Sequence, residues 1–555
     1  MQPSRRLAVC LLSVALSAAS GTAAERPPSP KEVRAAARLL GLDFTDPQVK
    51  MMLKGLAEQR QSFTRLRGVA LANDVPPAYD FNPLPPGFQF PSERRPLRLS
   101  PAGEVKLPER RDDLAFYSVR QLAELVRTRQ ISSVELTRFF LARLKEHGPR
   151  LAAVITLLEA RALAEAREAD EEIAAGHYRG PLHGIPYGAK DLLTARGAPT
   201  TWGAAPYREQ RIDRDATVVA RLHAAGAVLV AKMSLGELAM DDTWFGGQTK
   251  NPWDLKQGSS GSSAGSAAAT SAGLLPFAIG SETLGSIVSP SNRCGVTGVR
   301  PSYGRVSRSG AMMLSWSMDK LGPICREVED CAVVLDAILG RDGLDPTVYD
   351  APFNYDPAVD LKSLRIGYVK DAFDAEKDNK VNDALSLEAL HGLGVELVPI
   401  ALPAYPVDDM VIILTAEAAA SFDDLTLSSR DALLVGQGPD NWPNYFRVAH
   451  FIPAVAYIQA SRVRTLLIRD MARLMREVDV YVAPSLEGSN LVLTNLSGHP
   501  AVVMPNGFDK DGHPTSITFT GRLYDEARLL AVAKKWQDAT GQTQKAGYEN
   551  KTTDY

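Results

Sequence analysis

The chain has 555 residues, of which 45% are hydrophobic and 23% charged, and its formal net charge at pH 7 is −3. This composition is typical of a folded globular protein. The small acidic excess excludes a broad basic surface of the kind that binds nucleic acid or anionic membranes, so we expect no nucleic-acid partner.

The first 24 residues have the pattern of a secretory signal peptide. Arg5 and Arg6 precede a short apolar run, LAVCLLSVALSAA, and Thr22 and Ala24 supply small residues for cleavage. The run is too short to span a membrane stably, which disfavours the alternative of an uncleaved anchor. We therefore expect residues 1–24 to be removed, the mature protein to have no membrane partner, and the protein to be secreted or periplasmic.

Residues 25–109 predict an N-terminal extension that is first helical and then rich in proline. SPKEVRAAARLLGL begins with a serine cap and an early proline, and DPQVKMMLKGLAEQRQSFTRLRGVAL continues with apolar residues at helical spacing. VPPAYDFNPLPPGFQFPSERRPLRLSP contains too many prolines for a regular helix or a central strand. Its aromatic residues favour an extended strap on the domain surface over a disordered linker.

Residues 110–545 predict one α/β domain, and residues 546–555 are left as a C-terminal tail. SSVELTRFFLARLKEHG is typical of a helix, because Ser132 and Glu135 have capping-box spacing before an apolar stripe. GIPYGAK and AVLVAKM have strand character on either side of a helical stretch, DATVVARLHAAG, and VDVYVAPS is a later strand. This alternation indicates a largely parallel or mixed sheet.

The stretch GSSGSSAGSAAATSAGLLPFAIGSETLGSIVSP, from Gly258 to Pro290, has nine serines and no lysine or arginine. A flexible linker would have polar flanks, but this stretch continues into helix-like and then strand-like sequence. A phosphate loop would need a lysine after its glycines. We interpret the stretch as a tight loop that leads into a buried helix, with close packing of small residues as the remaining alternative.

Five motifs in order resemble the amidase signature family, which are serine hydrolases that act on amides. The resemblance covers roughly residues 110–545 and implies an α/β amidase-signature fold, a large mixed β-sheet covered by α-helices on both faces. The motifs are GPLHGIPYGAKDLL (Gly180–Leu193), SGSSAGSAAA (Ser260–Ala269), GSETLGSIVSP (Gly280–Pro290), CGVTGVRPSYGRVSRSGAMMLSWSMDKLGPICR (Cys294–Arg326) and TNLSGHPAVVMPNGFDKDGHP (Thr494–Pro514).

The resemblance assigns Lys190 as the base, Ser262 as a bridging serine on a cis peptide, and Ser286 as the nucleophile. A serine hydroxyl is a weak nucleophile that needs a base, and serine–lysine pairs are a known variant of the serine triad. A lysine can act as the base only when it is neutral, and burial lowers the pKa of an amine. The apolar GIPYGA before Lys190 fits a buried strand end. Ser263 and Ser266 are interpreted only as helix caps and loop hydrogen-bonding residues.

The resemblance also places the oxyanion hole on the backbone N–H groups of Thr283, Leu284, Gly285 and Ser286. These donors belong to the backbone, so they tolerate changes of side chain as long as the local conformation is kept.

Three positions near the nucleophile depart from the family pattern. Leu284 stands where the family has glycine, and we expect its Cβ to narrow the acyl pocket. Glu282 replaces an aspartate and Val288 replaces an arginine. We expect a supporting ion pair to be lost, unless Arg293 takes its place.

The resemblance implies hydrolysis of a carbon–nitrogen amide bond in a small amide or acylated amine, through an acyl-enzyme on Ser286. A small-molecule amide is the expected partner, and a homodimer stays open. One alternative is the glutaminase-type subunit of an amidotransferase, which YGRVSRSGAMMLSWSMDKLGP resembles and which the signal peptide argues against. The other is a catalytically weak binding protein on the same fold, suggested by Leu284 and Val288. Pocket walls are expected from 241–249, 312–316 and 400–460.

No metal or cofactor is expected, because the cysteines and the eight histidines have no zinc-ligand spacing. Beyond the signal segment the cysteines are Cys294, Cys325 and Cys331, an odd number that is no disulfide framework. A Cys325–Cys331 bridge is one alternative, and buried free thiols are favoured over it.

Overall fold

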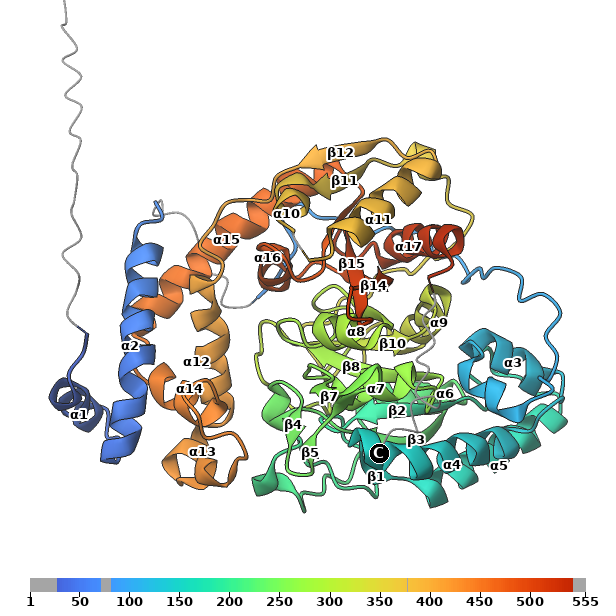
Figure 1. Ribbon diagram of the computed structural model, residues 1–555, viewed down its shortest axis with the longest axis horizontal. Helices are drawn as coiled ribbons and strands as arrows, with labels where there is room; N and C mark the ends of the chain where they lie inside the picture. The colour runs from blue at the N-terminus through green and yellow to red at the C-terminus, as the bar shows by residue number, and fades with distance from the viewer. Residues whose placement is uncertain (1–26, 71–80, 377, 543–555) are drawn as a thin grey trace, which may run out of the picture.

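The computed structural model describes residues 27–70, 81–376 and 378–542 (Figure 1). The predicted signal peptide (1–24) and C-terminal tail (546–555) lie outside these residues. Among the helices that the structure describes, none is both long and apolar enough to cross a membrane.

An 11-stranded mixed sheet runs through the centre of the molecule, in the order β1-β3-β2-β8-β10-β9-β14-β15-β13-β11-β12. Helices cover both faces, which confirms the predicted fold class (Figure 1). The strands are β1 (Val154–Leu157), β2 (Pro186–Lys190), β3 (Val228–Met233), β8 (Phe277–Glu282), β9 (Thr297–Arg300), β10 (Lys320–Cys325), β11 (Ile366–Val369), β12 (Leu397–Ile400), β13 (Val480–Pro484), β14 (Ala501–Phe508) and β15 (Pro514–Gly521). Two small hairpins pair β4 (Thr243–Trp244) with β5 (Gly247–Gln248) and β6 (Lys250–Asn251) with β7 (Asp254–Gly258).

Three of the described helices, α1, α3 and α4, begin at a serine whose side chain accepts a backbone N–H. The predicted capping box of α4 forms, because the Glu135 N–H donates to the Ser132 hydroxyl at 3.1 Å and the Ser132 N–H donates to the Glu135 carboxylate at 2.9 Å. The helices are α1 (Pro30–Leu39), α2 (Asp46–Arg67), α3 (Val119–Arg127), α4 (Ser133–Leu151), α5 (Glu159–Ala174), α6 (Thr217–Ala224), α7 (Ala264–Ser271), α8 (Val288–Cys294), α9 (Val328–Ile338), α10 (Lys370–Ala375), α11 (Lys380–Gly392), α12 (Ile412–Ser421), α13 (Asp423–Leu427), α14 (Trp442–Ala449), α15 (Ala454–Glu477), α16 (Asn490–Ser497) and α17 (Glu526–Thr540).

The serine-rich stretch contains a fully buried helix followed by a fully buried strand. Every residue of α7 and of β8 is buried, which fits the interpretation of a tight loop that leads into the core. The strand pairings explain the position of this stretch. β2 pairs in parallel with β8, and β8 pairs antiparallel with β10, so the end of β2 lies beside the end of β8.

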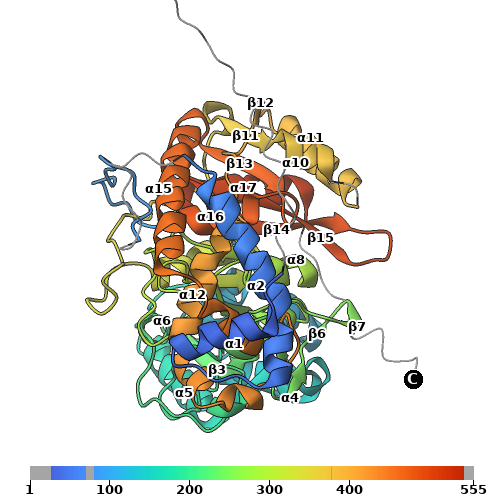
Figure 2. The ribbon, with the colours of Figure 1, turned by 90° about the vertical axis from the view of Figure 1, so that its left-hand side faces the viewer.

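The N-terminal extension lies on the outside of the helices near the C-terminal part of the chain. α2 packs against α14 and α15, and α1 packs against α2, on the side of the molecule that Figure 2 turns toward the viewer. Arg65 of α2 makes a two-pronged ion pair with Asp409, with N–O distances of 2.7 and 2.6 Å. Residues 81–107 contain neither helix nor strand, and their aromatic side chains pack on the domain. Phe81 packs on Tyr303 with 4.7 Å between ring centroids, and Phe90 packs on Tyr524 at 5.0 Å.

The three cysteines in the described part of the chain are free and buried. This confirms the prediction of buried free thiols, which was favoured over a Cys325–Cys331 bridge. Burial raises the pKa of the Cys294 and Cys325 thiols well above their usual value, so these two thiols stay protonated in the core.

Candidate active site

Lys190 is the last residue of β2, and its amine is surrounded by three serine hydroxyl groups. The parallel register sets Ala189 opposite Ile279, so Lys190 reaches the last residues of β8. Its Nζ lies 2.8 Å from Ser262 Oγ, 3.0 Å from Ser263 Oγ and 2.9 Å from Ser281 Oγ. The lysine side chain is fully buried, so the usual expectation for lysine, a solvated surface position, does not apply here.

Burial sets the protonation state of this lysine. It lowers the pKa of Lys190 well below the usual 10.5, and the negative charges of Asp319 and Glu282 oppose this only in part. A neutral amine has a lone pair and can take a proton, which is the property that the base assignment requires.

Two loops bring the predicted serines together. The Gly261–Ser262 peptide bond is cis, as the resemblance implied. Only glycine fits at 261, because a Cβ there would lie 1.6 Å from the Asp241 carbonyl oxygen. The Ser263 N–H donates to the Ser286 carbonyl at 3.1 Å, so the Ser262 loop is fastened to the residue predicted as nucleophile.

Solvent access differs along this set of residues. Lys190 and Ser262 are fully buried, whereas Ser286 is 8% exposed. The outermost member is therefore the serine that the family resemblance assigns as the nucleophile.

Two contacts of the lysine were missed by the sequence analysis. Ser263 was interpreted as a helix cap and a loop hydrogen-bonding residue; it stands at the N-cap of α7, but its hydroxyl makes no cap hydrogen bond, so only the hydrogen-bonding role holds. The hydroxyl instead contacts Lys190 and donates to the Ser281 carbonyl at 3.0 Å. Ser281 was not singled out at all. Ser266 donates to the Ile279 carbonyl at 3.1 Å and is a structural residue.

The turn from Thr283 to Ser286 presents backbone donors. Within the described part of the chain, no recorded hydrogen bond uses the N–H groups of Leu284, Gly285 or Ser286. Gly285 has φ of +83°, a conformation that favours glycine, whereas Leu284 has no positive φ and accommodates its Cβ without backbone strain. The Thr283 hydroxyl donates to Asp319 at 2.6 Å and anchors the start of the turn. This arrangement suits an oxyanion hole, the role that the resemblance implied.

Glu282 clamps the two residues after the nucleophile. One of its carboxylate oxygens accepts the N–H groups of Ile287 and Val288 at 2.8 and 2.9 Å. The other accepts from Arg300 Nη1 at 2.8 Å and from Asn495 Nδ2 at 2.8 Å. Burial alone would raise the pKa of Glu282, but Arg300 and Lys320 lower it to about 2. The glutamate is therefore ionised at neutral pH.

The expected loss of a supporting ion pair near the nucleophile is wrong. Arg300 of β9, rather than Arg293, pairs with Glu282, and both side chains of this pair are buried. Arg293 donates to Gln257 at 3.1 Å. A pair between residues on separate strands has no local spacing signal, because only the order of strands in the sheet brings them together.

Replacing Glu282 by glutamine is expected to lower the free energy of unfolding by about 3–5 kcal/mol, because it leaves Arg300 buried without its anion. We also expect kcat to fall by up to about 10²-fold as the turn that carries Ser286 shifts. Urea denaturation measures the first effect and steady-state kinetics the second. Glu159→Gln, at an exposed position on α5, is the control. It should change neither the free energy of unfolding nor kcat.

The pH dependence of stability gives the same interaction a second test. The folded-state pKa of Glu282 is depressed to about 2, so its stabilising contribution is present above the ordinary glutamate pKa near 4.5 and is lost as the pH falls toward about 2. Glu282→Gln should flatten this part of the stability curve. An unchanged curve would contradict the clamp.

Asp191, directly after Lys190, fixes the end of β2. It forms a buried ion pair with Lys232 and accepts the Thr201 N–H at 2.8 Å. The Trp202 N–H donates to the Asp191 carbonyl at 3.3 Å. The strand end that carries Lys190 is therefore fixed by Lys232 on one side and by the loop of Thr201 and Trp202 on the other.

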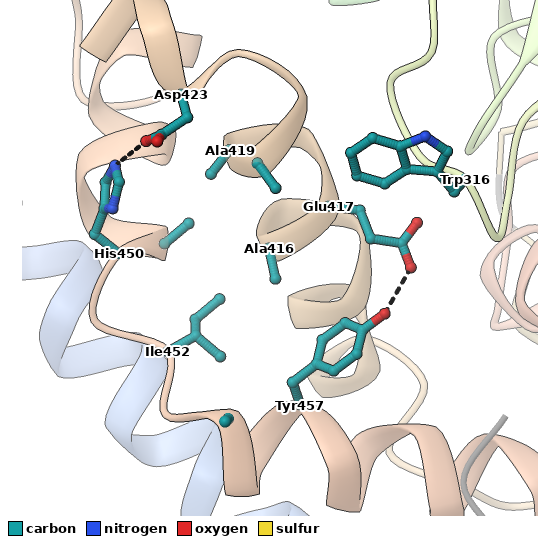
Figure 3. A pocket seen from close by; sticks show the side chains of 11 residues that line it. Trp316, Ala416, Glu417, Ala419, Asp423, His450, Ile452 and Tyr457 are labelled. Carbon is teal, nitrogen blue, oxygen red and sulfur yellow. Dashed lines mark hydrogen bonds and ion pairs between the residues drawn. The ribbon is translucent and has the colours of Figure 1, made fainter. Parts of the chain in front are cut away.

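An apolar cavity lies close to the loop that ends at Asp319 (Figure 3). Trp316 and residues of the stretch from α12 to the start of α15 line it, and these fall within two of the three predicted wall regions; that the regions form a substrate pocket stays a prediction. Residues 241–249 do not line this cavity; the Asp241 carbonyl instead packs against Gly261.

One cluster among the described residues has the geometry of a metal site. Ligand atoms of Asp509, Asp511 and His513, at the turn between β14 and β15, lie within 4.8 Å of one another. Asp509 already accepts the backbone N–H groups of Asp511 and His513 at 2.9 and 2.8 Å. The cluster is built as a turn, and the expectation of no metal stays a prediction.

Comparison with known proteins gives one family. Residues 135–491, which include Lys190, Ser262 and Ser286, match the family described as Amidase. The A subunit of glutamyl-tRNA(Gln) amidotransferase from Roseiflexus castenholzii is 37% identical over 471 residues, covering 76% of this chain and 96% of that protein. The corresponding protein of Geobacter metallireducens is 34% identical over 489 residues, covering 78% and 100%. Among solved structures, native peptide amidase from Stenotrophomonas maltophilia is similar with a TM-score of 0.71 and 30% identity, over 79% of this chain and all of that one (100%).

Proposed function

This chain belongs to the amidase family, and from that premise we propose that it cleaves a carbon–nitrogen amide bond through an acyl-enzyme on Ser286. The observation that carries the proposal is the buried amine of Lys190, hydrogen-bonded to Ser262 on a loop that is fastened to Ser286. The same observation disfavours a catalytically weak binding protein. Burying a lysine lowers the stability of the fold, and lysines with strongly lowered pKa values are found mainly at functional sites.

The hydrogen bonds of Lys190 give the relay a direction. A neutral amine has two N–H donors and one lone pair. The Ser263 hydrogen is used on the Ser281 carbonyl, so Ser263 accepts one N–H of the lysine. When Ser281 accepts the second N–H, the lone pair faces Ser262. Ser262 can then pass its proton to Lys190 while it accepts the proton of Ser286.

The acylation step uses these groups in order. Ser286 Oγ attacks the amide carbonyl carbon, and its proton moves through Ser262 to Lys190. The negative charge that develops on the carbonyl oxygen is stabilised by the N–H groups of the turn before Ser286, a term worth about 3–4 kcal/mol for one donor.

The remaining steps return the enzyme to its starting state. The C–N bond breaks as the leaving nitrogen takes a proton from Ser262, which Lys190 replaces. A water molecule then attacks the ester carbon, gives its proton to the same relay, and releases the carboxylic acid and the free Ser286 hydroxyl.

Two finer assignments follow from different relatives. The curated relatives are amidotransferase subunits, which supports the alternative that this chain is a glutaminase-type subunit working with partner proteins. The solved peptide amidase supports a hydrolase that acts alone on a small amide or acylated amine. Identity favours the subunit, since the curated relatives match at 34–37% and the peptide amidase at 30%, whereas both cover a similar share of this chain, 76–78% and 79%.

An assay of the purified chain without any other protein separates the two assignments. A stand-alone amidase should release ammonia from simple carboxamides and peptide amides at a rate unaffected by added protein. A glutaminase-type subunit should favour L-glutamine and gain activity only with its partners. Ammonia release is measured by coupled reductive amination of 2-oxoglutarate, which consumes NADH, with Ser286→Ala as the blank.

We also propose that the protein is exported, on the evidence of its first 24 residues alone. Mass spectrometry of protein isolated from the cell envelope or medium should find an N-terminus near residue 25. A protein that keeps Met1 and stays with the cytosolic fraction would contradict export, and would remove the argument against an amidotransferase component.

A further inference from the structure

The cavity of Figure 3, which we call the α12 cavity, has a volume of about 560 Å³. It lies between α12, the end of α14 and the start of α15, with the Trp316 indole on the opposite side (Figure 3). Cavities of this size hold substrate-sized groups. Small apolar residues supply much of its wall: Ala416, Ala419, Ala420, Ala449, Ile452 and Ala454.

The polar side chains of the α12 cavity contact one another or the neighbouring loop. Asp423 and His450 contact each other at 3.3 Å. Glu417 accepts hydrogen bonds from Ser315 Oγ at 2.5 Å and Tyr457 Oη at 2.9 Å. Glu417 is therefore fully engaged, and the rest of the described lining is mostly apolar, so the cavity suits an apolar group.

Hydrogen bonds connect the α12 cavity to the oxyanion turn. Glu417, in the cavity wall, also accepts from the Ser317 N–H at 3.0 Å and the Ser317 hydroxyl at 2.8 Å. Two residues on, Asp319 accepts the Thr283 hydroxyl at the start of the turn. The loop from 312 to 319 therefore has the cavity on one side and the catalytic turn on the other.

The same helix is held against the lysine strand. Phe422, at the end of α12, packs on Trp202 with 6.0 Å between ring centroids. The Trp202 N–H is the one that donates to the Asp191 carbonyl, next to Lys190. α12 is thus connected to the strand end that carries Lys190 and, through the loop that ends at Asp319, to the turn that carries Ser286.

Trp316 separates the α12 cavity from a second one. The second cavity, of about 650 Å³, shares Trp316, Glu417 and Tyr457 with the first. Trp316 is 48% exposed, unusual for a side chain so large in the wall of a pocket. The two hollows together give room for an extended ligand on both sides of the indole.

We propose that the α12 cavity binds an apolar part of the substrate, remote from the bond that is cleaved, so that the preferred substrates are amides with a long aliphatic or an aromatic group. This inference rests on the proposed amide hydrolysis. Free glutamine is a poor fit, because the described lining of the cavity contains no lysine or arginine to pair with its α-carboxylate.

A series of primary amides of increasing length tests the inference. We expect kcat/KM to rise from propanamide to octanamide, by roughly fourfold for each methylene that becomes buried, and to exceed the value for L-glutamine. Ala416→Phe, which fills the cavity from a half-buried position on α12, should lower kcat/KM for octanamide at least tenfold. It should leave propanamide within twofold.

Ala160→Phe is the matched control, since Ala160 is exposed on α5 and does not line the cavity. This variant should leave the whole series unchanged. If Ala416→Phe lowers the rates for propanamide and octanamide equally, or changes neither, the cavity does not hold the apolar group and the inference is overturned.

A binding measurement keeps this inference separate from the proposed chemistry. Octanamide binding to Ser286→Ala, followed by calorimetry, should be at least tenfold weaker when Ala416→Phe is added. Equal binding by the single and double variants would overturn the cavity assignment while leaving amide hydrolysis intact. Weaker binding by the double variant, with no turnover of any amide by the wild type, would support the cavity and reject the hydrolase.

Discussion

Ser286→Ala is expected to reduce turnover of any amide substrate by on the order of 10⁴-fold or more, while the protein stays folded. Losing the nucleophile removes the acyl-enzyme route, and only the weak effects of binding and the oxyanion donors remain. Ser286 is 8% exposed, so removing one oxygen at this position leaves no large buried void. Steady-state kinetics and the thermal unfolding midpoint give the two readouts.

Covalent labelling makes the same prediction visible without a substrate. A fluorophosphonate should attach to the wild type at Ser286 and fail to attach to Ser286→Ala. Ser266→Ala is the control, because Ser266 lies in the same stretch and its hydroxyl bonds only the Ile279 carbonyl. It should label normally. Equal labelling of the wild type and Ser286→Ala would show that this serine is not the nucleophile.

Lys190→Met is expected to abolish turnover to a similar extent and to leave the fold at least as stable near neutral pH. The relay loses its proton acceptor, because the Lys190 amine is the basic group that contacts Ser262 at 2.8 Å. The stability argument follows from burial, which disfavours the charged form of Lys190. Lys145→Met, at an exposed position on α4, is the control and should behave as the wild type.

The sign of the pH effect follows from the direction of the pKa shift. The folded-state pKa of Lys190 lies well below the usual 10.5, so between these two values the unfolded chain binds one more proton than the folded one. The contribution of this residue to stability therefore rises with pH across that window and is smallest at low pH. Lys190→Met should lose this slope in denaturant titrations. Wild-type kcat/KM should rise with pH and level off once the lysine is neutral.

Much of the fold and the identities of Lys190, Ser262 and Ser286 follow from the sequence, because short motifs fix loop conformations that allow few residue types. Gly261 is an example, since a Cβ there would strike the Asp241 carbonyl. The Glu282–Arg300 pair does not follow, because its partners lie on strands separated by β10 in the sheet. The roles of the three site residues remain predictions until the variants are measured.

Ser263 shows where a local sequence rule fails. A serine at the start of a helix usually caps it, and that rule predicts the wrong partner here. The buried Lys190 amine needs acceptors, and satisfying it outweighs a cap on α7. The α12 cavity could not be predicted from the sequence either. Its alanines come from three helices, and no motif indicates that they line one wall.

The N-terminal helices and the catalytic residues lie in different parts of the sequence, so substrate selectivity and catalysis depend on different segments. α2 packs outside α14 and α15, and Arg65 clamps Asp409 just before α12, so the extension supports the helices around the α12 cavity. The residues assigned to the chemistry all lie between 190 and 286. Gain, loss or change of residues 27–70 in evolution would therefore act on which molecules are accepted, with little effect on how the bond is broken. In such a chain, substrate selectivity can change during evolution while the catalytic residues stay the same.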